Sequence, residues 1–234
     1  VAATDDGFTA VGSATAADLN AKSQGVVLHS SDGITWAASL IPGTYSTGLI
    51  QVLTLGSKTL VRGLEWICTS TSYGVLDFNV GGQDRLWQST DGVSFDQVDL
   101  PSEIYTIENP APADPAACAG LGFNAISQFS AYSGSMNVAG DRLFVFSTDG
   151  ARVASTTDLA DWTPTSLDGA GPDGSSLALV EGTGFSIARV QRPERDGQPL
   201  DFGLQGLGWR SDASASTFSR APDTAPLLGL DPGP

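Results

Sequence analysis

Positive charge is scarce in this sequence. Of its 234 residues only 11 are Lys or Arg, against 26 Asp or Glu, and the formal net charge at pH 7 is −15. A nucleic-acid-binding protein needs a basic face that displaces phosphate counterions, and anionic membrane surfaces attract polybasic segments. We therefore predict that the protein binds no nucleic acid, and we interpret its acidity as a surface that keeps it soluble.

Histidine, cysteine and long hydrophobic runs are equally rare. His29 is the only histidine, and no CxxC or His/Cys spacing typical of a zinc site occurs. No run of about 18 apolar residues is present, which excludes a membrane-spanning helix. The two cysteines, Cys68 and Cys118, are compatible with one disulfide bridge, and the alternative is two unrelated buried thiols.

Helical patterns are also missing, since no long stretch repeats apolar residues at the i, i+3, i+4, i+7 spacing. Charged residues make up 16% of the chain, whereas there are 28 Gly and 13 Pro. This composition favours short strands joined by tight turns, so we predict an all-β protein. The chain opens on VAATDDGFTAVGS, a strand–turn–strand pattern. We expect that an upstream segment has been cleaved or left out and that the protein is secreted or extracytoplasmic.

What the sequence does contain is a short motif, Ser/Thr-x-Asp followed by an aromatic residue, repeated roughly every 60 residues. The aspartate can accept hydrogen bonds from backbone N–H groups of a turn, and the hydroxyl two residues earlier can bond across it. The aromatic ring then falls where it can pack between neighbouring sheets. The copies comprise Ser30, Asp32 and Trp36; Ser89, Asp91 and Phe95; Thr156, Asp158 and Trp162; and, in a stretched fourth version, Asp212 and Phe218.

Each motif lies between two strand-like runs and is preceded by two more, which predicts four units of about four antiparallel strands. Such units are typical of β-propeller blades, either in a small ring of four or in part of a larger propeller. We predict a single domain over residues 1–234. Its parts are blades at 1–41, 49–100, 126–167 and 174–221, a Pro/Ala-rich insertion at 101–125 and a C-terminal tail at 222–234.

The repeated segments SSDGITW and STDGVSF resemble the Asp-box, also called the bacterial neuraminidase repeat. The third copy, TTDLADW, lacks the glycine, and the fourth, RSDASASTF, has two extra residues before its aromatic. The resemblance extends over all four units and implies a propeller of the sialidase-like superfamily. In that family the boxes lie on the outer hairpins of the blades, so it also implies that the motif is structural and not catalytic.

Sialidases with this motif grip a carboxylate with three arginines and use a Tyr/Glu pair as nucleophile. By this resemblance Arg62, Arg142 and Arg189 are candidate ligands of a carboxylate, with Tyr132 and Glu181 as their partners. The Phe/Tyr-Arg-Ile-Pro segment expected near the start of a sialidase is absent, and four units are fewer than the six that sialidases use. We therefore predict no catalytic site, with the arginines on the surface or paired with local acids such as Asp84 and Asp141.

We predict a non-catalytic, exported scaffold that binds another protein or a cell-envelope component, as an accessory subunit of an envelope assembly. The alternative is a glycan-binding or sialidase-like glycosidase propeller. Candidate contact segments are the insertion and the loop 192–202. Trp66, Trp87 and Trp209 lie outside the motif and are either glycan contacts or core. We expect no cofactor, and the acidic segments 168–174 and 221–234 leave structural calcium as the open alternative.

Overall fold

The computed structural model describes most of the chain in two compact units, within which η1 (Ser102–Ile104), a single 3-10 turn, is the only helical element of the described residues. The described parts of Val1–Asp99 belong to the first unit, and those of Leu100–Ile107 and Gly134–Pro234 to the second. The described residues are 1–4, 7–14, 23–41, 46–70, 78–104, 135–147, 150–170, 174–191, 194–195, 198–199 and 205–221.

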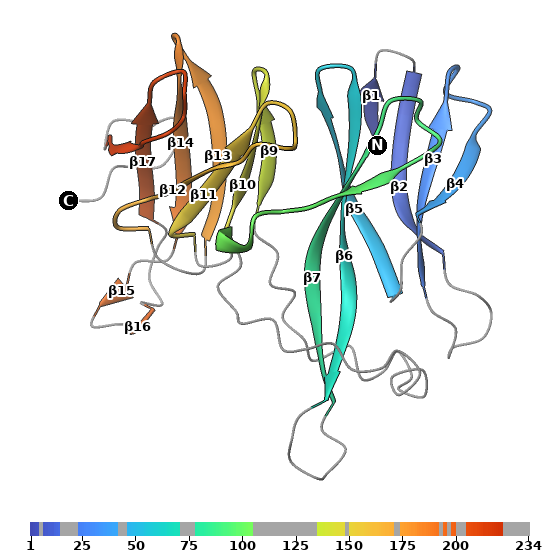
Figure 1. Ribbon diagram of the computed structural model, residues 1–234, viewed down its shortest axis with the longest axis horizontal. Helices are drawn as coiled ribbons and strands as arrows, with labels where there is room; N and C mark the ends of the chain where they lie inside the picture. The colour runs from blue at the N-terminus through green and yellow to red at the C-terminus, as the bar shows by residue number, and fades with distance from the viewer. Residues whose placement is uncertain are drawn as a thin grey trace. The chain divides into compact units, whose positions relative to one another are not determined.

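The first unit holds two four-stranded antiparallel sheets (Figure 1). In both, the strands follow chain order across the sheet, so that consecutive strands are hydrogen-bonded neighbours. Sheet 1 consists of β1 (Ala2–Thr4), β2 (Gly7–Ala14), β3 (Gln24–Ser30) and β4 (Ala37–Ile41). Sheet 2 consists of β5 (Ser46–Leu55), β6 (Lys58–Ser70), β7 (Phe78–Ser89) and β8 (Asp96–Val98).

The second unit repeats this arrangement. Sheet 3 consists of β9 (Met136–Ala139), β10 (Arg142–Phe146), β11 (Arg152–Thr156) and β12 (Thr163–Ser166). Sheet 4 consists of β13 (Gly174–Glu181), β14 (Gly184–Gln191), β17 (Gln205–Ser211) and β18 (Ser219–Arg220). Between β14 and β17 lies a small hairpin of β15 (Glu194–Arg195) and β16 (Gln198–Pro199).

The predicted fold class is confirmed: the described residues form an all-β chain with four four-stranded antiparallel, blade-type sheets. Every Asp motif occupies the turn between the third and fourth strands of its sheet, which is the turn that the sequence pattern predicted. The single-domain division stays a prediction. Of the insertion 101–125 only residues 101–104 are described, and the tail 222–234 lies outside the described residues.

Alternating side chains bury a hydrophobic core in each unit. In the first unit, Val27 and Ile41 of sheet 1 pack with Val61 and Trp87 of sheet 2 around Leu49. Leu49 fits there because Gly25 and Gly63 lack side chains: a Cβ on either glycine would lie 2.8 Å from a Leu49 side-chain atom. In the second unit the core is built around Phe144, Phe146, Ile187, Leu207 and Trp209.

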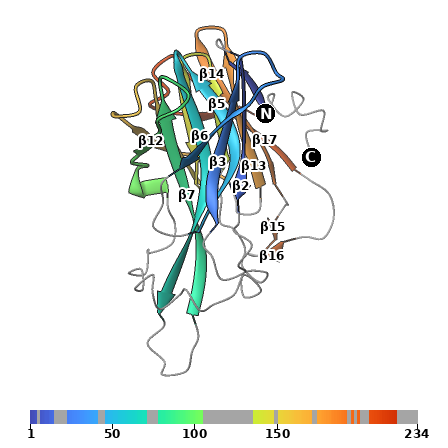
Figure 2. The ribbon, with the colours of Figure 1, turned by 90° about the vertical axis from the view of Figure 1, so that its right-hand side faces the viewer.

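Strands β6 and β7 are the longest of sheet 2, with 13 and 12 residues. Together they extend beyond the other strands as a two-stranded ribbon, visible in both ribbon views (Figure 2). The register of β5 against β6 shifts between Leu49 and Gln51, a bulge that lets the shorter β5 follow the twisted ribbon. Arg62 and Glu65 of β6 and Asp84 and Arg85 of β7 lie where these two strands pair with each other.

Candidate functional site

The first Asp motif is a turn closed by its own side chains. Asp32 Oδ1 accepts hydrogen bonds from the backbone N–H groups of Ile34, at 2.8 Å, and Thr35, at 2.7 Å. The hydroxyl of Ser30 donates to the same Oδ1 at 3.0 Å and accepts from the Gly33 N–H at 2.8 Å. The motif therefore satisfies the backbone of the β3–β4 turn without help from another strand.

The second and third copies make the same hydrogen bonds. Asp91 Oδ1 accepts from two N–H groups at 2.8 Å, and Asp158 Oδ1 from two N–H groups at 2.8 and 2.9 Å. In each copy the residue after the aspartate has a left-handed backbone, with φ of 75° at Gly33, 70° at Gly92 and 74° at Leu159. This explains why two copies carry glycine there, since a side chain in this conformation costs about 1–2 kcal/mol.

The fourth copy closes its turn differently. Arg210 stands where the other copies have Ser or Thr, and Ser214 takes over the hydroxyl role by donating to Asp212 Oδ1 at 2.6 Å. The backbone N–H of Ser214 donates to the same oxygen at 3.0 Å. The fourth copy, which has two extra residues before Phe218, therefore closes its turn with different hydrogen bonds from the other three.

These hydrogen bonds hold the motif carboxylates in their charged form. The backbone N–H groups of Thr35 and Ile34, with the Ser30 hydroxyl, lower the pKa of Asp32 to about 2. The equivalent bonds from Ser94, Val93 and Ser89 lower the pKa of Asp91 to about 2. A general acid needs a pKa near the working pH, so these aspartates are poor proton donors.

The aromatic residues of the four motifs have different surroundings. Phe95 packs against the core of the first unit, and Phe218 packs against that of the second, with its ring 6.4 Å from Phe144 in an edge-on arrangement. Trp162 is partly buried. Trp36 departs from the expectation of a ring packed between sheets, because it is 38% exposed. It lies just before β4, at the margin of sheet 1.

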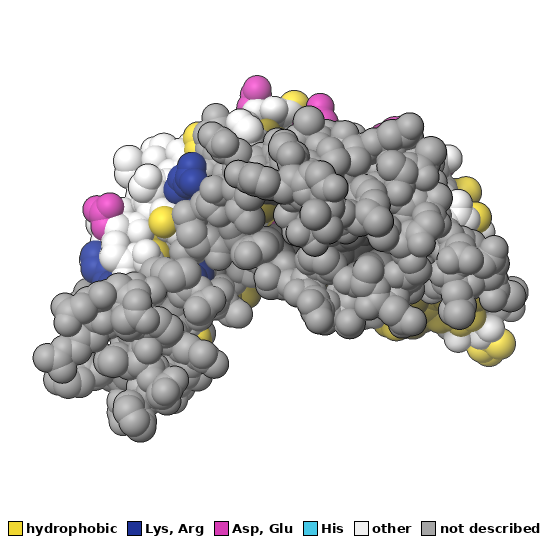
Figure 3. All heavy atoms as spheres, turned by 90° about the horizontal axis from the view of Figure 1, so that it is seen from below, with side chains coloured by type: hydrophobic (Ala, Val, Ile, Leu, Met, Phe, Trp, Pro, Cys, Tyr) yellow, Lys and Arg dark blue, Asp and Glu magenta, His cyan; other side chains and the backbone are white. Residues whose placement is uncertain are grey.

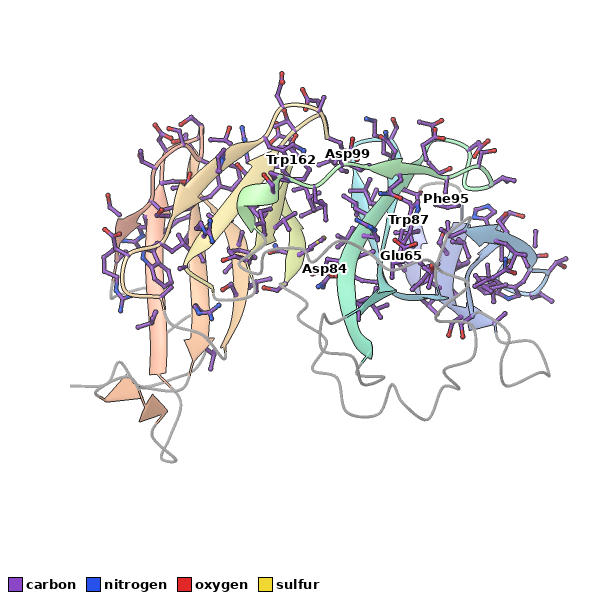
Figure 4. All side chains as sticks on the ribbon, turned by 60° about the horizontal axis from the view of Figure 1, so that its bottom comes forward. Glu65, Asp84, Trp87, Phe95, Asp99 and Trp162 are labelled. Carbon is purple, nitrogen blue, oxygen red and sulfur yellow. The ribbon has the colours of Figure 1, made fainter. Side chains whose placement is uncertain are left out.

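The arginine candidate of the first unit is engaged within sheet 2. Arg62 on β6 lies diagonally opposite Asp84 on β7, and its Nε and Nη2 donate to Asp84 Oδ1 at 3.1 and 2.9 Å. Both side chains are buried. On the other face of the same strands, Arg85 Nε donates to Glu65 Oε2 at 2.8 Å. Figure 4 shows Asp84 on one side of β7, with Glu65 and Trp87 on the other.

The two arginine candidates of the second unit lie at opposite ends of a sheet pair. Arg142, at the start of β10, donates to Ser155 Oγ at 3.2 Å and stacks over the ring of Phe185, with Cζ 5.9 Å from the ring centre. Arg189 is 1% exposed and donates to Ser176 Oγ at 2.8 Å. Phe185 and Arg189 are four residues apart on β14, which is about 13 Å along a strand. The two guanidinium groups are therefore not placed to share one carboxylate.

Of the remaining candidates of the enzymatic alternative, Glu181 is described and Tyr132 is not. Glu181 forms a two-pronged ion pair with Arg210, with Nε–Oε2 and Nη2–Oε1 distances of 2.8 and 2.7 Å. Tyr132, Cys118 and the side chain of Cys68 lie outside the described residues, as does that of Trp66. Trp87 and Trp209 belong to the two cores, with exposures of 2% and 0%.

Within the described residues, no three His, Cys, Asp or Glu side chains are grouped so as to hold a metal ion. None of the helical structure found in this part of the chain has the length and hydropathy needed to cross a membrane. The calcium alternative falls partly on undescribed residues and stays a prediction.

An apolar surface on sheet 1 was not predicted from the sequence. Register pairs place Phe8, Ala10, Val26, Leu28, Ala38 and Leu40 on the face opposite the core; we call these six residues the apolar face. Phe8 is 41% exposed and Leu40 56% exposed. Hydrophobic side chains are visible at the right of Figure 3, where β3 and β4 lie. The sequence feature that could have predicted this face is the run Val26-Val27-Leu28. A strand that is apolar on both faces is typical of a sheet covered on both sides.

No protein-family model matches this sequence, and no curated protein is similar to it. Among solved structures, a protein of unknown function from Dyadobacter fermentans is 20% identical, with a TM-score of 0.43, and the match covers 88% of this chain and 59% of that one. A glycosyl hydrolase from Bacteroides ovatus is 11% identical, with a TM-score of 0.41, over 91% and 67% of the two chains. A mutant Trypanosoma rangeli sialidase with trans-sialidase activity is 13% identical, with a TM-score of 0.42, over 94% of this chain but 36% of the sialidase. The fold assignment rests on the strand topology of this chain.

Proposed function

We propose that this chain is a non-catalytic, extracytoplasmic module that binds another protein through the apolar face of sheet 1. The observation that carries the proposal is the two-sided apolar character of this sheet. One side packs on sheet 2 through Val27 and Ile41, while the other exposes Phe8 and Leu40. Contiguous exposed apolar patches on otherwise polar proteins mark interaction sites.

The state of the charged groups supports a binding role over a catalytic one. Arg62 and Glu181 are each engaged in an ion pair, and Arg189 is buried against Ser176. The motif aspartates Asp32 and Asp91 have lowered pKa values and direct one oxygen each into their turns. Because the sequence predicts an exported protein, an accessory role in a cell-envelope assembly is the setting that we propose.

Site-specific photo-cross-linking in the producing cells tests this proposal. A photoreactive residue replaces Leu40 in one variant and Val180 in the control, since both side chains are 56% exposed and Val180 lies on a different sheet. We expect Leu40 to yield an adduct with one defined protein, lost when Phe8→Lys is added, and Val180 to yield none. Adducts from both positions or from neither would contradict the proposal.

A glycan ligand is the second candidate, favoured by two exposed aromatic side chains on sheet 1. Phe8 and Trp36 are 41% and 38% exposed, and they lie on β2 and just before β4 at the end of sheet 1 that carries the Asp32 turn. Aromatic rings with one apolar face free can stack on sugars. Glycan titration of the wild type and of Trp36→Ala distinguishes the two: saturable tryptophan fluorescence changes that disappear in Trp36→Ala would support the glycan.

A further inference from the structure

Among the described residues, the last strands of the four sheets differ in how their outer edges are protected from pairing. β8 has only three residues and includes Asp96, β12 contains Pro164, and β18 has two residues and includes Arg220. Short length, charge and proline are the means by which proteins prevent an edge strand from pairing with another chain. β4 has none of them: it is five residues long, Ala-Ala-Ser-Leu-Ile, and ends sheet 1.

From this difference we propose that β4 pairs edge to edge with β4 of a second copy of this chain, giving a two-fold dimer with a continuous eight-stranded sheet. The inference deepens the proposed function, on which it rests, by naming one partner of sheet 1. Addition of a strand to an open sheet edge is a common mode of protein association. Figure 1 shows β4 as the outermost strand of its sheet.

The sequence of β4 fits itself in the antiparallel direction. With the two-fold axis at Ser39, the two Ser39 side chains face each other, and Ala38 lies opposite Leu40 of the second copy. Ala37 lies opposite the second Ile41 in the same register. Each small side chain thus meets a large one, and such directly opposed pairs are the unit of sheet stabilisation. A two-fold interface requires this kind of self-complementarity.

Charge and continuity favour a second copy as the occupant. The chain has a net charge of −15, yet β4 contains no charged residue, so two copies can approach here without opposing carboxylates within the strands. Ala38 and Leu40 belong to the apolar face, and the pairing joins the apolar faces of both copies into one surface. A five-residue strand pair buries less than about 1,200 Å², so we expect a weak dimer with a Kd on the order of 100 μM.

Sedimentation velocity of the purified chain between about 1 μM and 1 mM measures this dimer. We expect a concentration-dependent shift from monomer to dimer that strengthens with salt, because salt screens the repulsion between acidic molecules. Leu40→Lys should weaken the dimer at least tenfold, although it lowers the net negative charge and hence the repulsion. Val180→Lys changes the charge equally and should leave the dimer unchanged.

A cysteine scan tests the register. In Ser39→Cys the two thiols are directly opposed and should form an intermolecular disulfide under mild oxidation. In Ala38→Cys they are diagonal, about 7–8 Å apart, and should not. The wild type shows the contribution of the two native cysteines. Thermal unfolding of each variant establishes that it is folded.

A wild type that stays monomeric up to 1 mM would overturn the inference, and so would a dimer that Leu40→Lys leaves intact or a Ser39→Cys variant that does not cross-link. None of these results would contradict the proposed function, whose cross-link from Leu40 to a different protein is a separate measurement. Failure of that cross-link, with the dimer present, would instead leave a second copy as the only partner.

Discussion

Two nitrogens of Arg62, Nε and Nη2, donate to one oxygen of Asp84 from the neighbouring strand, at 3.1 and 2.9 Å, and both side chains are more than nine-tenths buried. The enzymatic alternative requires the Arg62 guanidinium to bind the carboxylate of a ligand, whereas in this structure it pairs with Asp84. A buried charge that loses its partner is costly, so removing either member of the pair alone should destabilise sheet 2.

Asp84→Ala should therefore lower the free energy of unfolding by about 3–5 kcal/mol, because it removes the carboxylate that pairs with the buried Arg62 charge. The double variant Arg62→Met with Asp84→Leu should recover most of this loss, since it removes both charges. Urea unfolding of the wild type and the two variants measures both values. If the single and double variants lose equal stability, the pair does not have the role assigned to it.

Because of the hydrogen bonds to Asp32 and Asp91, we expect the stability of the fold to depend on pH in the acidic range. Their pKa values in the folded protein, about 2, lie below the ordinary value of 3.8. A lowered pKa means that the stabilisation is present above pH 3.8 and is lost as the pH falls from 3.8 towards 2. We expect the unfolding temperature of Asp91→Asn to lie below that of the wild type at pH 7. The difference between the two temperatures should close by about pH 2. A gap that is constant with pH would contradict this account.

Three glycine-to-alanine substitutions separate backbone strain from lack of space. Gly92 and Gly150 have nearly the same φ, 70° and 69°, but a Cβ on Gly92 would be 3.7 Å from its nearest neighbour, whereas one on Gly150 would overlap the guanidinium of Arg189. Gly92→Ala should cost about 1–2 kcal/mol of unfolding free energy, and Gly150→Ala should cost more. Gly12, with open space and no left-handed backbone, is the control and should change stability little.

The sheets of this chain were predictable from its sequence because local signals agree with the final topology. Asp-Gly turns between alternating apolar runs fix a hairpin within about ten residues, as around Asp32 and Asp91, and no distant contact is needed to interpret them. The position of each motif in the third turn followed from counting strands on either side. Leu159 shows that the left-handed position persists even without glycine.

The candidate site was less predictable, since it depends on contacts between strands. The partner of Arg62 is set by the register of β6 against β7, which places Asp84 diagonally across from it. Whether Phe8 and Leu40 are covered depends on what packs on sheet 1, which alternation within a strand does not specify. Glu181 and Arg210, 29 residues apart, meet only because β13 and β17 both flank β14.

We predict that Arg62, Arg142 and Arg189 do not bind one carboxylate together, because Arg62 pairs with Asp84 and Arg189 is buried against Ser176. NMR spectra of the arginine Nε–H groups, recorded while N-acetylneuraminic acid is added to tens of millimolar, test this prediction. None of the three signals should move in a saturable way. Saturable shifts of two or more of them, abolished together by a single arginine substitution, would contradict it and establish a shared anion site.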